Sequence, residues 1–345
     1  MEKEPVLHLL KSNVFSGAEN VVVQIIRLFR HERKMFYCSP KGKIVDSLKM
    51  RGIRHISLKS FNPVILWEII NKYNIGIIHA HDPGASVLAS LIPKKIMIIA
   101  HIHGNHDNMK IISFKSVLFL ISSLRYRKII WVSNSCYNDY YFKKYLKSKS
   151  MILENIINPE EVKMKQLENS LAESYDCIYL GRLSQEKDPI RAIEIIKKVV
   201  MKIPNFKMVF VGDGVLRHDC QKLVEKYKLD NNIFFKGFQD NPIPYLYNSK
   251  ILLMTSRYEG VPMSALEAMC LGKPIISTPT DGLIELIDLN KTGFYSDDDN
   301  QLIEYIIKLY KNKEMYKLIS QNALQRFTNY NDIEYYKKRI EECYE

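Results

Sequence analysis

Two carboxylates in one short segment are the strongest chemical feature of the chain. The segment 256–279, SRYEGVPMSALEAMCLGKPIISTP, has Glu259 in a turn and Glu267 in the helical pattern that opens with Pro262. At about 1.5 Å per residue the two carboxylates lie roughly 8–12 Å apart, which exceeds the spacing of a retaining hydrolysis pair. Carboxylates accept hydrogen bonds from vicinal sugar hydroxyls, and a helix N-terminus between them favours phosphate. This spacing suits the two ends of a sugar nucleotide. The alternative is one Glu that stabilises the helix dipole and one that is merely exposed.

Two cations follow another apolar run, in YLGRLSQEKDP. The run ends at Gly181, Arg182 and Lys187 share the next loop, and a helix is expected to begin near Asp188. Arginine offers a planar fork and lysine a point charge, so the pair is suited to hold a diphosphate. The alternative is a pair of surface cations, with Lys187 bound to Glu186.

Glycine-containing turns follow other apolar runs. Gly212 and Gly214 in FVGDGVLR predict a sharp strand-to-helix turn, although a lone G-x-G is a weak phosphate signal. The segment FKGFQDNP includes Phe238 and predicts a turn whose backbone could meet a nucleobase edge. Near the start of the chain, Gly17 in SGAE opens a helical pattern, which is typical of an anion-binding turn.

Two H-x-H pairs occur at predicted strand ends, His79 with His81 and His101 with His103. Such pairs could bind a metal, but no cysteine pattern supports this, and we expect no metal site. A hydrogen-bonding or proton-handling role in a cleft is favoured, with a structural role as the alternative. The acidic run 297–299 precedes a helical pattern, and helix capping is the better interpretation than metal binding.

Strand and helix patterns alternate along the whole chain. The runs that we interpret as strands are Pro5–Leu10, Lys34–Cys38, Ile75–His79, Ile96–His101, Lys128–Val132, Asp176–Leu180, Lys207–Val211, Ile233–Lys236, Ile251–Thr255, Pro274–Ser277 and Gly293–Tyr295. The helical patterns are Glu19–Phe29, Pro63–Tyr73, Gly84–Leu91, Pro189–Met201, Leu216–Tyr227, Pro262–Leu271 and Gln301–Tyr310. This alternation predicts an α/β fold with parallel, doubly wound sheets covered on both faces. Ligands of such sheets bind beyond the carboxyl ends of the strands.

The length of 345 residues favours two domains. The segment 155–174 is polar and charged, and we interpret it as a linker. We therefore expect an N-terminal Rossmann-like domain over residues 1–160 and a second one over 161–327, with a ligand cleft between them. A final helix over 328–345 could cross back onto the first domain.

The charge of the chain is uneven. Residues 1–150 contain 24 Lys and Arg against 9 Asp and Glu, whereas the remainder contains 26 against 29. The basic half predicts an anionic partner, which is either a membrane surface or nucleic acid. No aromatic–basic RNA-recognition motif accompanies it. A bias of the genome toward lysine is a further explanation. The apolar stretch Ile111–Leu124 is too short to span a bilayer and, with Arg125, Arg127 and Lys128 after it, predicts an interfacial helix on anionic lipid. A core helix is the alternative.

The six cysteines are scattered without a C-x-x-C pair, which fits a reducing compartment. No signal peptide is recognisable at the first residues. We therefore expect a cytoplasmic protein that docks peripherally on the inner face of the plasma membrane.

Taken together, these segments resemble the retaining glycosyltransferases of family 4, which have the GT-B fold of two facing Rossmann-like domains. The family's E-x7-E resembles Glu259 with Glu267, its G-R-L-x-x-E-K resembles GRLSQEK, and its G-x-G resembles GDG at 212–214. Thr280, Gly282 and Glu285, and the T-G-F element at 292–294, resemble two further motifs. The likeness covers most of the chain and is densest over residues 179–295.

The resemblance implies a role for each matching residue. Arg182 and Lys187 would neutralise the leaving diphosphate, Glu259 would contact the donor sugar, and His103 would lie beside the reacting sugar. Residues implied to bind the donor are Gly17, Gly181, Gly212, Gly214, Phe238, Gly260, Val261, Pro262, Met263, Ser264 and Glu267, the last at the ribose hydroxyls. Three positions depart from the family pattern: SGAE has one glycine where two are common, Asp188 stands where glycine is frequent, and Val261 replaces a common aromatic.

The implied reaction is transfer of a sugar, with retention, from a nucleotide-diphosphate sugar to a hydroxyl of a glycan or lipid-linked glycan. UDP-sugars are the expected donors, with guanosine diphosphate mannose as the alternative. Cell-surface polysaccharide such as capsule or exopolysaccharide is the expected pathway, and no cofactor or metal is implied. Attack is viewed as coming from the same face as the leaving phosphate, which assists the incoming hydroxyl. A nucleic-acid-binding protein and a nucleotide-binding module without catalysis are the alternatives.

Overall fold

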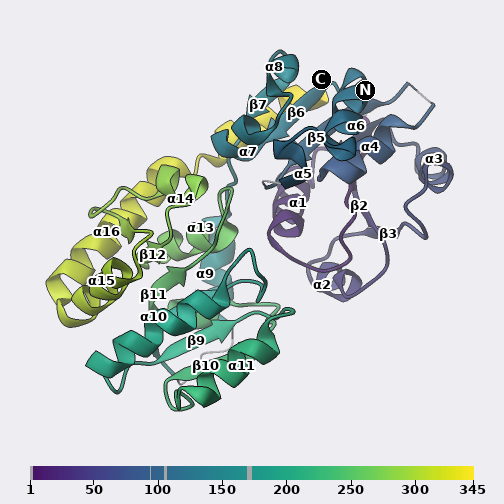
Figure 1. Cartoon of the computed structure of the whole chain (residues 1–345). Coiled ribbons are helices and arrows are strands. Elements are labelled where there is room, and N and C mark those ends of the chain that lie inside the picture. The colour runs from purple at the N-terminus through teal and green to yellow at the C-terminus, as the bar shows by residue number, and fades with distance from the viewer. Residues whose placement is uncertain (1–2, 94, 105–106, 169–172) are drawn as a thin grey trace. The chain divides into compact units, whose positions relative to one another are not determined.

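The chain forms two compact units. A computed structural model describes residues 3–93, 95–104, 107–168 and 173–345. The first unit comprises the chain up to Ile156 together with Ile333–Glu345, and the second comprises Ile157–Asp332. The last helix is therefore part of the first unit. Each unit is described separately below (Figure 1).

The first unit is built on a parallel sheet with the strand order β3-β2-β1-β4-β5-β6-β7. Its strands are β1 (Val6–Leu9), β2 (Met35–Ser39), β3 (His55–Ser57), β4 (Ile77–Ala80), β5 (Met97–Ile102), β6 (Lys128–Trp131) and β7 (Ser150–Ile152). The central strands β1 and β4 are fully buried, which explains why they read as continuous apolar runs.

Helices cover both faces of this sheet. They are α1 (Gly17–Leu28), α2 (Ile44–Met50), α3 (Pro63–Lys72), α4 (Pro83–Ser90), α5 (Asp107–Lys110), α6 (Phe114–Ser122), the 3-10 turn η1 (Ser123–Arg125), α7 (Asn134–Asp139), α8 (Lys143–Leu146) and α17 (Ile333–Tyr344). One core joins Leu7 and Leu9 to residues of α3 and α4, and another joins Tyr37 to residues of α1. The side chains of Leu7 and Leu9 therefore lie on one face of the sheet, and the side chain of His8 lies on the other.

The second unit repeats the topology in its sheet order β10-β9-β8-β11-β12-β13. Its strands are β8 (Tyr175–Leu180), β9 (Met208–Val211), β10 (Ile233–Gly237), β11 (Ser249–Met254), β12 (Ile275–Ser277) and β13 (Gly293–Tyr295), all paired in parallel. In this order the chain reverses its direction of winding between β8 and β11, as it does between β1 and β4 in the first unit. Such switch points open a crevice at the carboxyl ends of the strands.

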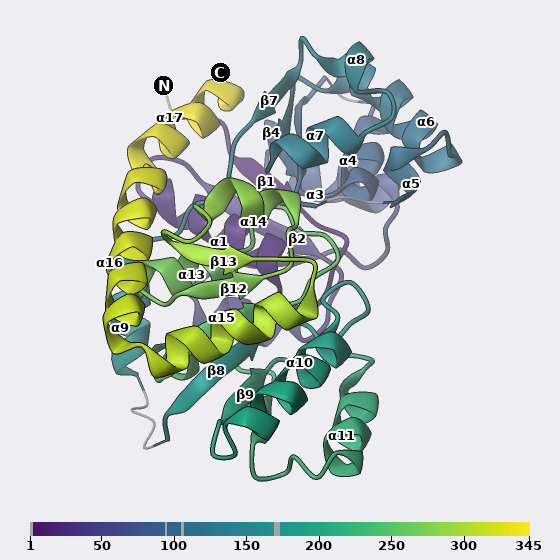
Figure 2. The ribbon, with the colours of Figure 1, turned by 60° about the vertical axis from the view of Figure 1, so that its left-hand side comes forward.

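The helices of the second unit lie on both faces of its sheet. They are α9 (Pro159–Leu167), α10 (Pro189–Lys202), α11 (Arg217–Lys226), α12 (Ile243–Tyr247), α13 (Met263–Cys270), α14 (Asp281–Leu286), α15 (Asp299–Lys311) and α16 (Lys313–Tyr330). Helices α10 and α15 lie side by side, as do α13 and α16 (Figures 1 and 2). The doubly wound α/β prediction is confirmed in each unit.

The boundary between the units falls within the predicted linker 155–174, after Ile156, but residues Pro159–Leu167 of this segment form helix α9, which the linker prediction missed. Helix α9 forms there because Asn158 accepts a hydrogen bond from the Glu160 N–H at 3.0 Å, and Pro159 occupies the first helical position. The helix buries Glu161 and Val162 and packs on α12 and α13. Residues 169–172 of the segment lie outside the described residues.

Within the part of the chain that is described, no helix combines the length and the hydropathy that crossing a bilayer requires.

Candidate functional site

The switch point of the second sheet places an ion pair between two loops. Lys187, in the loop after β8, binds the carboxylate of Glu259, in the loop after β11, and the Ser256 hydroxyl donates to the same carboxylate oxygen at 2.7 Å. The Glu259 side chain is only 9% exposed. Lys187 thus pairs across the crevice with Glu259 and not with its neighbour Glu186. The pKa of Glu186 is lowered mainly by a hydrogen bond from Ser184, with smaller contributions from Arg182 and Lys187.

The backbone around Lys187 is held from two strands. The Tyr179 hydroxyl donates to the carbonyl of Arg182 at 3.0 Å and to that of Lys187 at 3.3 Å. The Thr255 hydroxyl donates to the carbonyl of Asp188 at 2.7 Å. These contacts fix where the loop ends, while the Arg182 side chain is exposed. The two cations therefore share one anchored loop.

Asp188 accounts for its own departure from the family pattern. Its φ of 43° and ψ of 60° lie in the left-handed region, where glycine is the default residue and aspartate is tolerated. Its carboxylate caps α10 by accepting from the Arg191 N–H at 3.3 Å, and it pairs with Arg257 at 3.2 Å. The hydrogen bonds of the Asp188 side chain offset the strain of this left-handed conformation, which glycine would adopt without strain.

Gly212 and Gly214 are required by close packing of two loops. A Cβ on Gly212, whose φ is +140°, would lie 1.9 Å from the carbonyl oxygen of Gly181. A Cβ on Gly214 would lie 2.4 Å from the carbonyl oxygen of Leu183. These glycines thus bring the loops after β8 and β9 into direct backbone contact.

The segment 260–264 begins helix α13. The helix starts at Met263, with Pro262 as the N-cap, so the prediction that Pro262 lies inside the first turn was wrong by one residue. The cause is the extended ψ of 134° at Pro262. Gly260 and Val261 are buried, Ser264 is half-buried, and no side chain caps the first turn.

Gly282 in α14 holds this segment from behind. A Cβ there would lie 1.7 Å from the carbonyl oxygen of Gly260 and 3.0 Å from the nitrogen of Val261. The Gly282 N–H also points at the carbonyl of Glu259, at 3.4 Å. The motif residue Gly282 therefore fixes the turn that carries Glu259.

Glu267 is half-buried in the second turn of α13. Burial raises its pKa from 4.5 to about 7, the charge of Lys165 lowers it, and that of Glu161 raises it. Lys165 and Glu161 form their own ion pair at 2.7 Å on α9. Glu267 is thus a carboxyl group that titrates near neutral pH.

The other predicted residues lie apart from this crevice or in the other unit. Phe238 follows β10 and is 50% exposed. Gly17 is the first residue of α1, with open space where a Cβ would point, and Ser16 binds the buried Glu19 instead of capping the helix backbone. His103 follows β5, and its Nε2 lies 2.9 Å from Nδ1 of His81. The structure therefore pairs Lys187 with Glu259, with Arg182 in the same loop as Lys187, and leaves Gly17 and His103 in the first unit.

Sequence reasoning missed two features. The Ser256 hydroxyl on Glu259 carried no signal beyond its position three residues earlier. His8 joins the two H-x-H pairs, with its Nδ1 2.9 Å from Nε2 of His81. His8 could not be linked to these pairs from the sequence, because only the strand order shows that β1 lies beside β4.

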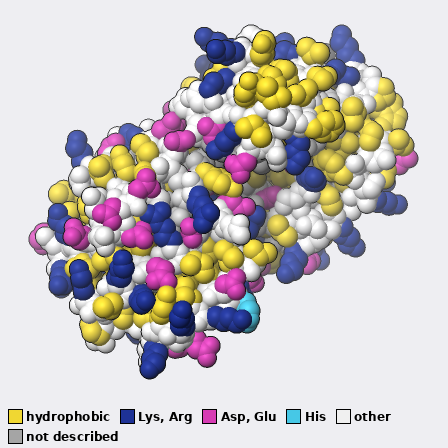
Figure 3. All heavy atoms as spheres, viewed as in Figure 1, with side chains coloured by type: hydrophobic (Ala, Val, Ile, Leu, Met, Phe, Trp, Pro, Cys, Tyr) yellow, Lys and Arg dark blue, Asp and Glu magenta, His cyan; other side chains and the backbone are white. Residues whose placement is uncertain are grey.

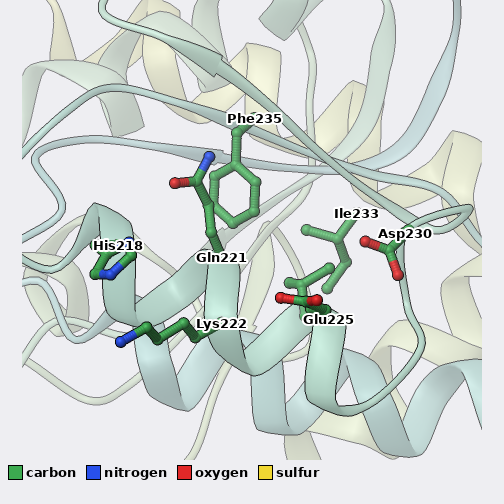
Figure 4. A pocket seen from close by; sticks show the side chains of 8 residues that line it. His218, Gln221, Lys222, Glu225, Asp230, Ile233 and Phe235 are labelled. Atoms are coloured by element: carbon green, nitrogen blue, oxygen red, sulfur yellow. The ribbon is translucent and has the colours of Figure 1, made fainter.

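Two surface hollows lie away from the predicted residues. One of about 380 Å³ lies beside the edge strand β10 and is lined by Gln221, Lys222 and Glu225 of α11 and by Phe235 (Figure 4). The other is lined by Lys3, Gly76 and Lys95 at the amino ends of the first sheet's strands. Neither contains a residue predicted to bind the donor.

The second unit matches a known family. Residues 162–326, which form most of the second unit, match the model described as glycosyl transferases group 1, so the chain is similar to this family over that unit. The acidic run behaves as expected, because Asp298 caps α15 by accepting from the Asn300 N–H at 2.9 Å.

Individual relatives agree with this assignment. An uncharacterized glycosyltransferase of Methanocaldococcus jannaschii is 30% identical over 258 residues, which are 64% of this chain and 62% of that protein. The capsular polysaccharide biosynthesis glycosyltransferase CapH of Staphylococcus aureus is 25% identical over 362 residues, covering 98% of both chains. The chain thus spans less than two thirds of the first of these relatives.

A solved structure extends the likeness to the fold. The Anabaena HepE protein in complex with UDP-glucose superposes with a TM-score of 0.84 over 98% of both chains, at 16% identity. The protein therefore has the GT-B fold, with a Rossmann-like parallel sheet in each unit.

Proposed function

We propose that the protein is a retaining hexosyltransferase that moves a sugar from a UDP-sugar to a hydroxyl of a glycan or lipid-linked glycan. The observation that supports this best is the Lys187–Glu259 pair at the switch point of the second sheet, inside the segment that matches the family. The names of the relatives, one for capsular polysaccharide and one bound to UDP-glucose, support the donor and the pathway of cell-surface polysaccharide synthesis.

The proposed chemistry uses the groups in the crevice. The bond between the anomeric carbon and the diphosphate oxygen breaks, and a bond to the acceptor oxygen forms on the same face. The proton of the acceptor hydroxyl goes to an oxygen of the leaving phosphate. Arg182 and Lys187 stabilise the negative charge of the leaving diphosphate, as preorganised cations do in other transferases. This assignment gives charge neutralisation to side chains and requires no metal for the transfer.

The binding roles follow from the same positions. Glu259, released from Lys187 when the diphosphate arrives, accepts hydrogen bonds from the donor sugar, and Glu267 accepts them from the ribose. The segment Gly260–Ser264, which leads into the uncapped first turn of α13, faces the phosphates with its N–H groups. Gly181, Gly212 and Gly214 allow close backbone approach. The exposed ring of Phe238 is available to the base, and Gly17 and His103 act on the sugar side.

Nucleotide release in the presence of paired donors and acceptors tests the activity. UDP-sugars are expected to raise the melting temperature, because a ligand that binds only the folded state stabilises it by mass action. At a ligand concentration 100 times the Kd, the free energy of unfolding rises by about 2.7 kcal/mol. Guanosine diphosphate mannose serves as the comparison donor. Stabilisation by no nucleotide sugar would refute the proposal.

Lys187→Met and Glu259→Gln test the site. Each is expected to lower transfer at least 100-fold, because each removes a group that meets developing charge. Lys250→Met is the matched control, since Lys250 pairs with Asp176 at 2.8 Å elsewhere in the same unit. Full transfer by the two site variants would show that the site is wrongly assigned.

We also propose that helix α6 docks the protein on an anionic membrane. Its buried positions are Ser116, Phe119 and Ser122, with Ser123 of η1 buried beside them, whereas several apolar side chains are exposed. The exposed apolar side chains in and beside α6 are Ile111, Ile112, Phe114, Ile121 and Leu124. Figure 3 shows hydrophobic side chains gathered on this unit, with Lys and Arg among and around them. Phe119 anchors α6 on the core of the unit, and the exposed apolar side chains among Lys and Arg support an interfacial helix.

Flotation with anionic liposomes tests the docking. Binding is expected at low salt, weaker at high salt because part of it is electrostatic, and lost in the double variant Phe114→Ser, Leu124→Ser. Met50→Ser is the control, because Met50 is an exposed apolar side chain elsewhere in the unit. Equal flotation of the double variant and the control would contradict the assignment to α6.

A further inference from the structure

Five histidines gather on one face of the first sheet, at its switch point. His8 lies opposite His79 in the register of β1 and β4, and Ala80 lies opposite Ala100 in that of β4 and β5. His81 and His101 therefore stand one step beyond this last pair, and side chains two residues apart in a strand share a face. The row ends at His103, and the arrangement follows from strand order and spacing together.

The rings are close enough to share a ligand. One ring nitrogen each of His81, His101 and His103 lies within 4.8 Å of the others. The ring centroids of His101 and His103 are 4.1 Å apart. The distance from His81 Nδ1 to His103 Nε2 is 2.9 Å. Nitrogens bound to one tetrahedral Zn²⁺ at about 2.0–2.1 Å are about 3.3 Å apart, so small ring movements suffice.

His101 is the most unusual member of the row. It has no exposed surface, and neither of its ring nitrogens has a hydrogen-bond partner among the described residues. Leaving one buried polar group unsatisfied costs about 1–3 kcal/mol. Since a neutral imidazole has one N–H and one lone pair, His101 leaves both unsatisfied. A ligand that accepts the lone pair would remove part of this cost.

Histidine is a suitable donor for an ion at this place. Metal ligation by histidine requires the neutral ring, and imidazole is a preferred ligand of Zn²⁺, Co²⁺, Ni²⁺ and Cu²⁺.

We propose that His81, His101 and His103 form a binding site for a divalent transition-metal ion of the zinc class. His103 is half-exposed and the other two are buried, so the set offers three imidazoles and one side open to water. Three histidines with an open fourth position are a known arrangement for Zn²⁺.

His8 supports this assignment from behind. When His81 binds the ion through Nδ1, its Nε2–H donates to Nδ1 of His8, at 2.9 Å. The Nε2–H of His8 then donates to the sulfur of Met35, at 3.4 Å. Ligating histidines commonly donate their other N–H in this way, which fixes the tautomer and the ring orientation.

The proposal departs from our expectation of no metal site, because the sequence showed two pairs and not the shared face or the unsatisfied His101. It is independent of the proposed function, since binding is measured without a donor or an acceptor.

Metal binding to the full-length, untagged chain tests the site. After removal of metals by a chelator, Zn²⁺ is titrated by equilibrium dialysis with elemental analysis, and Co²⁺ by visible absorption. One ion per chain is expected. His101→Gln and His81→Gln are expected to weaken binding by about tenfold or more. His218→Gln is the matched control, because His218 is an exposed histidine of the second unit.

Spectroscopy of the wild-type chain keeps the test decisive where a variant does not fold. X-ray absorption of the zinc-loaded protein is expected to show three imidazole nitrogens at about 2.0–2.1 Å. Sulfur at about 2.3 Å would place the ion on cysteine and overturn the proposal. Absence of stoichiometric binding, or equal binding by His101→Gln and His218→Gln, would leave the five rings as a structural polar row.

Discussion

Replacing Glu267 with Gln should change how the stability of the second unit depends on pH. Burial raises the pKa of this carboxyl from 4.5 to about 7, so the folded state holds its proton more tightly than the unfolded state. Below pH 4.5 both states are protonated and the effect is absent. Between pH 4.5 and 7 only the unfolded state ionises, so stability falls as pH rises, and above pH 7 the full cost remains.

The magnitude follows from the same two values. At about 1.4 kcal/mol per pH unit, a rise in pKa from 4.5 to about 7 corresponds to a cost of about 3 kcal/mol at high pH. Titration of a single group with these two values gives a loss of about 2–3 kcal/mol between pH 5 and pH 8. Glutamine does not ionise, so the Glu267→Gln variant should lack this loss.

Urea unfolding followed by far-UV circular dichroism, at pH 5 and pH 8, measures the difference. Both tryptophans, Trp67 and Trp131, lie in the first unit, so their fluorescence reports that unit separately. Glu304→Gln is the control, because Glu304 is an exposed glutamate on α15. An equal loss of stability in the wild type and in Glu267→Gln would refute the account of Glu267 as a desolvated carboxyl group.

Two further predictions concern the turn that carries Glu259. Gly282→Ala should destabilise the second unit by about 1–3 kcal/mol and weaken UDP-sugar binding, because its Cβ must displace the Gly260 carbonyl; Gly104→Ala, which meets nothing within 4 Å, is the control, and calorimetry measures both. Lys187→Met should destabilise by about 1–3 kcal/mol because it leaves the buried Glu259 carboxylate unpaired, and adding Glu259→Gln should recover most of that loss; additive effects in the double-mutant cycle would contradict the pairing.

The strands could be predicted from the sequence because parallel strands buried on both faces are continuous apolar runs. Helix α9 could not, because within a polar and charged segment it buries few residues, among them Glu161 and Val162, and its start depends on the Asn158 cap. Strand β7 has a half-buried and exposed pattern and pairs with β6 at one edge, so its short run carried little signal. Local pattern thus predicts elements that make up the core and misses those that only cover it.

The residues of the candidate site could be predicted from the sequence, but the contacts between them could not. Arg182, Lys187 and Glu259 were each recognised from loops that follow apolar runs. That Lys187 binds Glu259 and not Glu186 depends on β8 lying beside β11, a contact between positions 72 residues apart. The same holds for His8, which joins His79 and His81 only because β1 pairs with β4. Strand order is a property of the tertiary structure. The spacing of residues in the sequence therefore cannot show which residues meet at a switch point.

The two units apply one topology to different chemistry. Each sheet winds in both directions from a central strand pair, β1 with β4 or β8 with β11, and each opens a crevice there. In the second unit the crevice holds charged groups that neutralise one another, so an incoming diphosphate can replace Glu259 as the partner of Lys187. In the first unit the switch point carries the imidazole rings of His8, His79, His81, His101 and His103 on one face. The ammonium group of Lys187 can pair with an anion, whereas the lone pair of a neutral imidazole can bind a metal cation.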